Sequence, residues 1–527
     1  MSPSQLKDFS QSLVATHLFS SNILFWIESG YFEAAAEQKP LLHTWSLAVE
    51  EQFYLVFPVV LASSWALGRH HVVGFLSLIA ILSLGLSEWG FRTIPDANFF
   101  LTPFRLWELV VGAIAAQIAL NWHPIRSDTL SIAGIALIII GFSTFDSTTP
   151  NPSAITLIPV LGTVLVLLCS GPTTIRLLSI KPLVGVGLIS YSAYLWHQPV
   201  FAFARIYSVE SLSPLLLSAL IGLTVVLAYL TWRWIEQPVR NASHWAYPST
   251  PQFLIGTGVM MLFSIGVGVS GHLTDGFKSR FKEVLEGDVG HTTFHQRLDE
   301  YFLDCQPGEI ADNALTWNGF LRCKQSRPGP MDWILLGDSH AEHLFLGLAE
   351  SRPDKNIGFY IQNGKPYLDA PDFQEIFSVL ASTPPATVFL AMYYAPRLRH
   401  ANDLEMQYSK VIEYLSANGH RVVLVGDVPD FKVEPELCKL DNGHRSFARF
   451  CNQPTHAFDH TRETYEPVLQ KLAARYGIQY IPIHAPLCHA DQCSMVLQNQ
   501  VLYRDRNHLN IPGSRLIGSY LSEQVKD

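Results

Sequence analysis

The chain has 527 residues, more than one hydrophobic core usually organises, so two or more domains are expected. Charged residues make up only 15% of it, against about 25% in an average soluble protein. Together with a positive mean hydropathy of +0.19, this excludes a disordered chain, a coiled coil and an ordinary soluble enzyme. The net charge of −9 gives no reason to expect nucleic-acid binding. The composition predicts a membrane-embedded part joined to a more polar part.

Apolar stretches between residues 43 and 272 predict a multi-span α-helical membrane domain over residues 1–272. Each stretch is close to the roughly 20 residues that a helix needs to cross a bilayer. The expected spans are 48–67, 72–90, 105–121, 129–146, 154–170, 184–204, 212–232 and 252–272. Residues 11–29 fit either a ninth span or an amphipathic helix lying in the membrane interface.

Basic residues on the short connections predict how these spans are oriented. They fall on alternate connections, which the positive-inside rule assigns to the cytoplasm. These residues are Arg69, Arg126, Arg176, Lys181, Arg233 and Arg240. The intervening connections, such as 147–153, carry little positive charge. Everything after residue 272 is therefore expected to lie outside the cytoplasm.

Six of the seven cysteines lie in this later part of the chain: Cys305, Cys323, Cys438, Cys451, Cys488 and Cys493. An even set at short spacings predicts disulfides formed in an oxidising compartment. Pairing of sequence neighbours is one of many possible connectivities. A zinc site is the alternative interpretation, which the absence of a Cys-x-x-Cys pair disfavours, and no metal is expected.

Residues 331–527 predict an α/β domain, which follows a linker segment over 273–330. Short apolar runs typical of buried strands alternate with helical stretches, and this alternation indicates a mostly parallel sheet. The expected strands are 332–338, 386–392, 421–427 and 478–483. The expected helices include 341–351, 402–418 and 461–476.

A serine motif directly follows the first of these strands and precedes a helix, in Gly337-Asp338-Ser339-His340. Catalytic groups often lie at the carboxyl ends of parallel strands, where helix N–H groups stabilise negative charge. A serine nucleophile needs a base, and the base needs an orienting acid. Asp505 and His508, near the end of the chain, supply such a pair. Either motif alone is more often a capping turn or a solvated loop, so it is their combination that predicts a triad.

This combination resembles the SGNH (GDSL-like) hydrolase superfamily, which implies a three-layer α/β/α fold. By resemblance, Ser339 is the nucleophile, His508 the base and Asp505 the acid that orients it.

The resemblance also implies an oxyanion hole built from the Ser339 amide and a glycine of a second sequence block. Gly364, next to Asn363, is the candidate for that block. The asparagine of a third block has no match, because residues 393–396 read Tyr-Tyr-Ala-Pro.

Four groups of polar residues interrupt the apolar stretches of the membrane domain. Ionisable residues inside a membrane are costly and therefore candidates for function. The candidates are His43, Glu50, Glu51, Arg105, Glu108, Tyr194, His197 and Glu236. Structural interpretations stay open: headgroup contact for the paired glutamates, an i,i+3 ion pair for the arginine, and an aromatic belt for the tyrosine.

Taken together, these groups resemble the acyltransferase-3 family of membrane O-acyltransferases. The matching runs, in the order of the family, are HTWSLAVEEQFYLVFP, RLWELVVGA, ISYSAYLWHQP and RWIEQP. Members usually begin with further spans that carry an Arg and a catalytic His, and this sequence contains no such segment. The resemblance therefore predicts a fragment, a misassigned start, or a separate polypeptide that supplies those spans.

The fused architecture implies an enzyme that O-acylates a cell-surface or periplasmic polysaccharide such as lipopolysaccharide O-antigen. Cytoplasmic acyl-CoA, with acetyl as the expected group, is implied as the donor, and no bound cofactor is expected. The implied location is the bacterial inner membrane, multi-pass, with the C-terminal domain in the periplasm. A membrane-anchored serine esterase that removes acyl groups and an inactive fragment are the alternatives.

Overall fold

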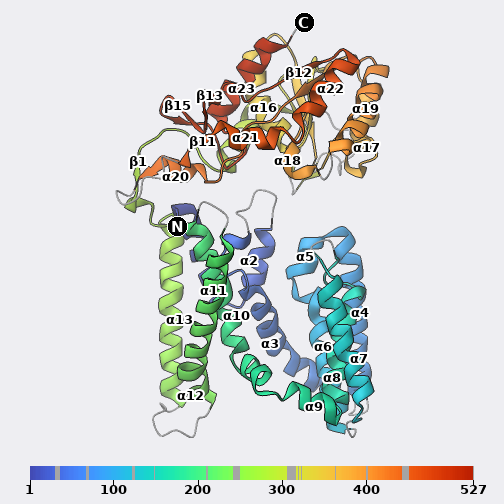
Figure 1. Cartoon of the computed structure of the whole chain (residues 1–527), viewed down its shortest axis with the longest axis vertical. Coiled ribbons are helices and arrows are strands. Elements are labelled where there is room, and N and C mark those ends of the chain that lie inside the picture. Colours follow the sequence, from blue (N-terminus) through green and yellow to red (C-terminus); the bar gives the residue numbers. More distant parts are fainter. Residues whose placement is uncertain are drawn as a thin grey trace. The chain divides into compact units, whose positions relative to one another are not determined.

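The computed structural model describes the chain apart from residues 30–35, 67–70, 122–124, 147–148, 209–211, 241–249, 306–315, 318–319, 322, 363, 399–400, 442–449 and 526–527. It forms two compact units, Met1–Lys278 and Ser279–Asp527 (Figure 1).

The first unit is helical. Its main helices are α1 (Pro3–His17), α2 (Ser21–Ile27), α3 (Thr44–Ala66), α4 (Val72–Thr93), α5 (Pro95–Phe100), α6 (Thr102–Asn121), α7 (Asp128–Thr144), α8 (Leu157–Cys169), α9 (Pro172–Leu178), α10 (Lys181–Tyr207), α11 (Pro214–Thr231), α12 (Gln237–Arg240) and α13 (Thr250–Leu273). Large apolar side chains on their outer surfaces are exposed, as in Phe142 (90%) and Leu215 (82%). Water would disfavour so much exposed apolar surface, so these helices are suited to a lipid environment.

Five helices are long and apolar enough to cross a membrane: Thr44–Ser63, Val72–Thr93, Pro95–Leu120, Pro214–Arg240 and Pro251–Leu273. The spans predicted at 129–146, 154–170 and 184–204 are helical but fall short of this standard. α7 has only 17 residues, and α10 is long but not apolar enough. α8 continues into α9 with a bend of 110°, which makes the pair a broken span or a re-entrant loop. Residues 11–29 lie in α1 and α2, of 15 and 7 residues, too short for a ninth span.

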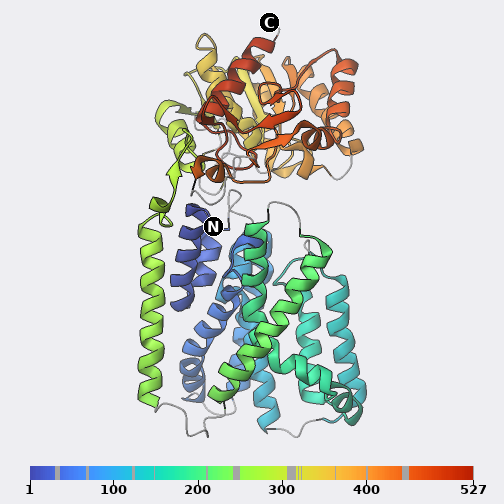
Figure 2. The same ribbon diagram turned by 60° about the vertical axis from the view of Figure 1, so that its left-hand side comes forward.

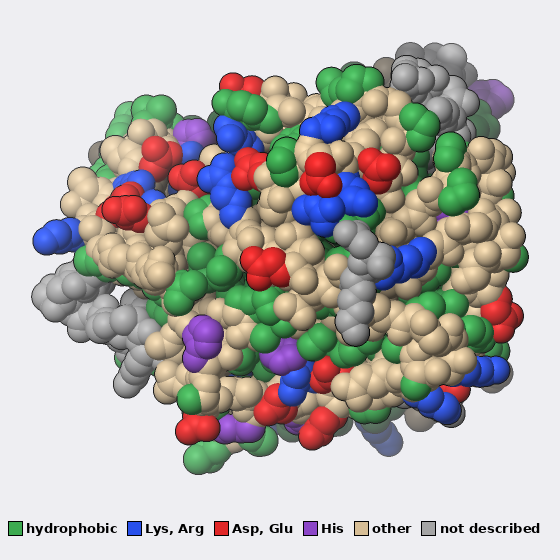
Figure 3. Space-filling model, turned by 90° about the horizontal axis from the view of Figure 1, so that it is seen from above, with side chains coloured by type: hydrophobic (Ala, Val, Ile, Leu, Met, Phe, Trp, Pro, Cys, Tyr) green, Lys and Arg blue, Asp and Glu red, His purple; other side chains and the backbone are tan. Residues whose placement is uncertain are grey.

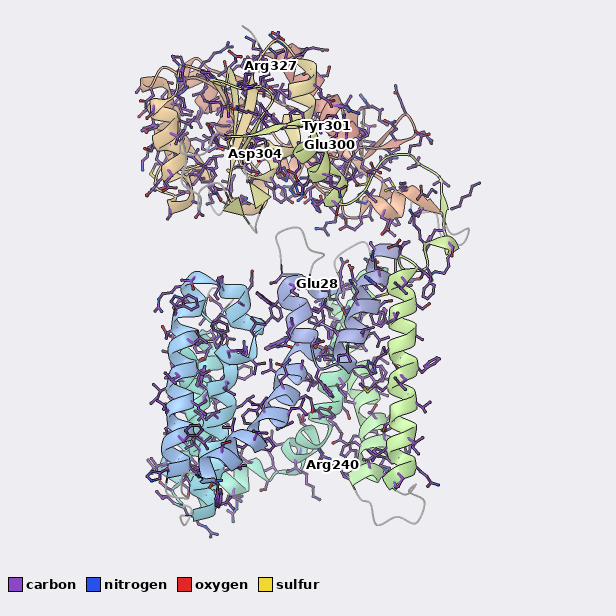
Figure 4. The ribbon with its side chains drawn as sticks, turned by 180° about the vertical axis from the view of Figure 1, so that it is seen from behind. Glu28, Arg240, Glu300, Tyr301, Asp304 and Arg327 are labelled. Carbon is purple, nitrogen blue, oxygen red and sulfur yellow. A yellow bond between two sulfur atoms is a disulfide. The ribbon has the colours of Figure 1, made fainter. Side chains whose placement is uncertain are left out.

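The basic connections gather at one end of this unit. Helices α9 and α12, which carry Arg176 and Arg240, lie at the end opposite α2 and α5 (Figure 1, Figure 2). Figure 4 labels Glu28 and Arg240 at these opposite ends. The predicted basic residue Arg69 lies outside the described residues.

The second unit is built on a seven-stranded sheet in the order β12-β9-β8-β6-β7-β5-β2. Its strands are β2 (Leu303–Asp304), β5 (Cys323–Gln325), β6 (Trp333–Gly337), β7 (Ile357–Ile361), β8 (Thr387–Ala391), β9 (Arg421–Val425) and β12 (Gln479–Ile481). The five from β12 to β7 are parallel, while β5 and β2 are antiparallel to their neighbours. The four strands predicted from sequence are present, and the segment before residue 330 adds two more strands to the sheet.

Helices cover both faces of this sheet, so the predicted three-layer α/β/α fold is confirmed. Alternate residues of β6 face opposite sides because side chains in a strand alternate. Ile334 and Leu336 join a core formed with α17 (Pro371–Ser382), α19 (Ala401–Ala417) and α22 (Glu466–Tyr476). The other face packs against α16 (Ser339–Ser351), where Phe345 meets Phe359 of β7 with ring centroids 4.9 Å apart. α16 in turn packs on the last helix, α23 (Ile511–Gln524).

Disulfides hold the loops of this unit. The structure pairs Cys305 with Cys323, Cys438 with Cys451 and Cys488 with Cys493, as pairing of sequence neighbours predicts. The seventh cysteine, Cys169 of the first unit, is buried and free. The face of the second unit seen in Figure 3 intermixes acidic and basic side chains, as a water-exposed surface does.

Candidate active site

Ser339 lies at the turn between β6 and α16. A Cβ atom on Gly337 would come within 1.6 Å of the Ala391 carbonyl oxygen, so only glycine allows this turn to approach β8. Asp338 then caps the helix, and its carboxylate accepts the His340 amide N–H at 2.9 Å. Ser339 is therefore the first residue of α16, close to the unpaired N–H groups and positive dipole end of that helix.

The three residues predicted as a triad are in hydrogen-bond contact. His508 Nε2 lies 2.7 Å from Ser339 Oγ, and His508 Nδ1 lies 2.7 Å from Asp505 Oδ2. The other oxygen of Asp505 accepts the backbone N–H groups of Asn507 and His508, at 2.8 and 2.7 Å. This turn fixes the carboxylate, which in turn fixes the imidazole with its free nitrogen toward the serine.

The electrostatics suit a neutral base beside an ionised acid. Burial lowers the pKa of His508, against the opposing attraction of Asp505, so the imidazole is neutral and can accept a proton. Burial would raise the pKa of Asp505, but His508 and His291 more than reverse this, and the pKa lies well below its usual range. This arrangement can activate a serine hydroxyl for attack on an acyl carbonyl.

A second buried network supports the turn from the opposite side. Asp338 accepts the Tyr393 amide N–H at 3.1 Å, and Arg397 Nε lies 2.8 Å from the same carboxylate. These contacts join the serine turn to the loop after β8. Arg397 and Tyr393 follow the strand in the region where the asparagine of the third block was absent.

His340, next to the serine, belongs to a further pair. Its Nδ1 lies 2.6 Å from Asp427 Oδ1, and its ring stacks on Tyr393 with centroids 4.4 Å apart. Burial would lower the pKa of His340, but Asp427 reverses this and raises it. The His340 and His508 ring centroids are 4.9 Å apart, so the His340–Asp427 pair lies directly beside the base.

The predicted oxyanion donors differ in whether the structure leaves them available to bind an oxyanion. The Ser339 amide lies at the helix N-terminus, as that role requires. The Gly364 N–H donates to the Gln362 carbonyl oxygen at 2.9 Å, so it would have to leave this bond to serve an oxyanion. Asn363 lies outside the described residues.

In the first unit, three of the predicted candidates come together. The His43 ring lies 5.2 Å from that of Tyr194 and 5.4 Å from that of His197, between centroids. The Tyr194 hydroxyl bonds Ser46 Oγ at 2.6 Å and also donates to the His43 carbonyl. Polar groups of α3 and α10 are thus joined at one point.

The remaining membrane candidates form separate pairs. Arg105 lies 3.2 Å from Glu108 and above the ring of Trp45, while Glu236 accepts the Ser192 hydroxyl at 3.1 Å. Within the described part of the chain, Glu50 and Glu51 have no hydrogen bond or ion pair to these groups. Among the described residues, no cluster of three or more His, Cys, Asp or Glu could hold a metal ion.

The sequence did not reveal three groups near the triad: the His340–Asp427 pair, Arg397, and His291 of α14 (His291–Tyr301). His291 Nε2 lies 3.0 Å from Asp505 Oδ2. The signals for these residues were weak. His340 adjoins the serine motif, and His291 begins a short helical pattern, but their partners are distant in sequence.

The fold and the site define a class: a membrane domain joined to an α/β domain with a serine, histidine and aspartate triad arrangement. Comparison with known families agrees with this class. Residues 9–233 match the acyltransferase domain, and residues 304–523 match the SGNH domain that is fused to such domains. The chain thus carries one region that matches an acyltransferase domain and a second region that matches the SGNH domain found fused to such domains.

The chain is also similar to individual proteins. The chain is 31% identical over 276 residues to the O-acetyltransferase OatA of Staphylococcus aureus, in strains NCTC 8325 and COL. That alignment covers 47% of this chain and 44% of OatA, so the chain spans less than half the length of these relatives. A solved structure, the periplasmic domain of a lipopolysaccharide acetyltransferase from Salmonella ser. Paratyphi A, aligns with 44% of this chain and 95% of its own. Its TM-score is 0.32 and its sequence identity 14%.

Proposed function

We propose that this protein moves an acetyl group from cytoplasmic acyl-CoA to hydroxyl groups of a cell-envelope polysaccharide, such as lipopolysaccharide O-antigen. The observation that carries the proposal is the hydrogen-bonded chain from Ser339 through His508 to Asp505, in a protein that also has an acyltransferase domain. Acetyl is chosen because the relatives are O-acetyltransferases. Acyl-CoA is a donor substrate here, not a bound cofactor.

The chemistry in the second unit takes two steps. Ser339 Oγ attacks the acyl carbonyl carbon while His508 Nε2 takes the hydroxyl proton, and the donor group leaves with that proton as the acyl-serine ester forms. A sugar hydroxyl then attacks the ester while His508 takes its proton. The carbon–oxygen bond to Ser339 breaks, and the proton returns to Ser339 Oγ. Asp505 holds the imidazole tautomer and balances its charge in both steps.

The location proposed is the bacterial inner membrane, with the second unit in the periplasm. Three disulfides support this side for the second unit, because disulfides persist in the periplasm and are rare in the cytosol. The basic end of the first unit, with α9 and α12, supports a cytoplasmic assignment for that end. α13 begins beyond α12 and ends at Leu273 at the opposite end of the unit (Figure 1).

We assign the group formed by His43, Tyr194 and His197 to handling of the acyl group within the membrane. Ionisable side chains inside a membrane domain are costly, so their concentration where the start of α3 meets α10 supports a functional role. Arg105, Glu108, Glu236 and the two glutamates Glu50 and Glu51 are secondary candidates for the same task.

The test is transfer of radiolabelled acetyl to envelope polysaccharide in cells. Four strains are compared: one with the chain as given, one with Ser339→Ala, one with Ser351→Ala, and one with an empty vector. Ser351 ends the same helix far from the triad, so it is a matched serine control. The proposal expects label with the chain and with Ser351→Ala, and none with Ser339→Ala or the vector.

Two results contradict the proposal. Label that survives Ser339→Ala would exclude the acyl-serine route. Loss of pre-existing acetyl groups from the polysaccharide, dependent on Ser339, would identify the chain as a membrane-anchored esterase instead.

A further inference from the structure

We propose that His291 is a positioning residue of the triad, and that helix α14, between the two matched domains, completes the active site. The inference rests on the proposed function for its chemistry. α14 spans His291–Tyr301, whereas the family matches cover residues 9–233 and 304–523. A helix outside both matches therefore touches the catalytic acid.

The sequence of α14 explains how it reaches the site. His291, Phe294, His295 and Leu298 follow the spacing i, i+3, i+4, i+7, which puts them on one face of a helix. Phe294 and Leu298 are buried, with exposures of 1% and 2%. His295 Nε2 lies 3.2 Å from Glu342 of α16, so this face is docked by apolar packing and by both histidines. The opposite face carries polar residues; Figure 4 labels Glu300 and Tyr301 at the end of the helix.

Backbone contacts fix where α14 begins. The Gly290 N–H donates to the Arg504 carbonyl at 2.7 Å, and the Asn510 side chain donates to the Asp288 carbonyl at 2.9 Å. Gly290 has a φ of +87°, a left-handed conformation that favours glycine. The segment before α14 is thus held along the loop that carries Asp505 and His508, and His291 is its first helical residue.

His291 shares one carboxylate oxygen with His508. Asp505 Oδ2 lies 2.7 Å from His508 Nδ1 and 3.0 Å from His291 Nε2. A carboxylate can only accept, so a neutral His291 donates its Nε2–H. The two rings lie with centroids 5.8 Å apart at 73°, edge to face. Two backbone N–H groups donate to Oδ1, so the Asp505 carboxylate has four donors in all. The His291 donor limits rotation of this carboxylate and reduces the negative charge that Oδ2 offers to His508.

Other ionisable groups surround this contact from every packed element. Burial lowers the pKa of His291, and Asp505 opposes this shift, so His291 is neutral near pH 7. The groups that face His291 and Asp505 are Arg504 and His508 on the same loop, His295 on α14, His340 and His343 on α16, and Glu434 after β9. Because these remain in a His291 variant, the variant isolates the effect of one donor on Oδ2.

The expected effect concerns the basicity of His508. Without the His291 donor, Asp505 Oδ2 places more charge on His508 and stabilises its protonated form. The apparent pKa of His508, which sets the acidic limb of the rate–pH profile, should then rise by about one unit. A merely structural role for His291 would lower the melting temperature without moving this limb.

The experiment follows labelling of Ser339 by a fluorophosphonate probe, as a rate against pH, on the full chain in detergent micelles. This reaction reports the activated serine without any acetyl donor or polysaccharide. Ser339→Ala sets the background. His291→Leu fills the space without a donor, and His291→Gln keeps an N–H donor. His295→Leu is the matched control on the same face, since His295 contacts Glu342 and not the triad.

The inference expects His291→Leu to shift the acidic limb of the rate–pH profile upward by about one pH unit, so that labelling slows by about tenfold at pH values below the wild-type limb. His291→Gln should bring the acidic limb most of the way back to its wild-type pH. His295→Leu should lower the melting temperature but leave the pH of the acidic limb unchanged. An unshifted limb in His291→Leu, equal losses in the Leu and Gln variants, or a wild type that does not label Ser339 at any pH would each overturn it. Ser339 labelling with the expected shift, but without acetyl transfer in cells, would leave this inference standing and reject the proposed function.

Discussion

The two units hold their polar side chains in different ways. In the second unit, Ser339, His508, Asp505 and His291 form one continuous chain of contacts, reinforced by backbone N–H groups from the loop that carries the acid. In the first unit, the candidate residues form separate small groups, each within one helix or between two. Loops at strand ends can offer backbone donors to a carboxylate, whereas helix backbones have already used theirs.

This contrast has a chemical consequence. The site in the second unit is preorganised, so single substitutions there should abolish serine chemistry altogether. The groups in the first unit depend on local pairing, so substitutions there should reduce transfer by smaller factors and leave the serine reactive. The following predictions test that difference, beginning with the largest effect.

Asp505→Asn should have the largest effect. An amide at this position would accept from His508 less well and favour the wrong imidazole tautomer, so hydrolysis of 4-nitrophenyl acetate by the full chain in detergent should fall about 10⁴-fold. Asp491→Asn, on an exposed turn of the same unit, should retain wild-type rates. A rate for Asp505→Asn within threefold of wild type would show that the second unit does not depend on a preorganised acid.

The sequence predicted this core of the site because each part carries a local signal. The apolar run before Gly337 indicated a buried strand, and the Asp505 to His508 spacing indicated a local acid–base pair. The structure confirms the sheet and brings the pair to the serine at 2.7 Å. β7 was missed because its run, IGFYI, is short and interrupted by glycine.

The missed features depend on contacts between residues distant in sequence. His291 has no local partner, since its acid lies in the last loop of the chain, and the sequence of residues 273–330 predicts only a linker segment. In the first unit, eight apolar stretches predicted eight spans, but apolarity alone does not show where a helix bends. The bend between α8 and α9 falls at Ser170 and Gly171, just before Pro172, a signal that the apolar pattern concealed.

Removal of one disulfide should have an intermediate effect, confined to the second unit. Cys438→Ala with Cys451→Ala frees a loop closed over a sequence separation of 13 residues, which should cost about 3 kcal/mol of stability. The melting temperature of the second unit, followed by near-UV circular dichroism of the full chain, should fall by about 10 °C. Cys169→Ala, at the free cysteine of the first unit, is the control and should leave that transition in place. An unchanged transition in the double variant would mean that this disulfide does not stabilise the second unit.

Tyr194→Phe should have the smallest effect and separates the two units most sharply. It removes the hydroxyl that joins Ser46 to the His43 carbonyl, and leaving such partly buried polar groups without this partner costs at most about 1–3 kcal/mol. Acetyl transfer to polysaccharide should therefore fall about tenfold, while hydrolysis of 4-nitrophenyl acetate at Ser339 stays unchanged, because the triad has no group from this helix. Tyr191→Phe is the matched control: it lies on the same helix, with an exposed side chain, and should change neither rate. If Tyr194→Phe lowered both rates equally, the two units would act as a single catalytic site; if it lowered neither, the group at His43 would have only a packing role.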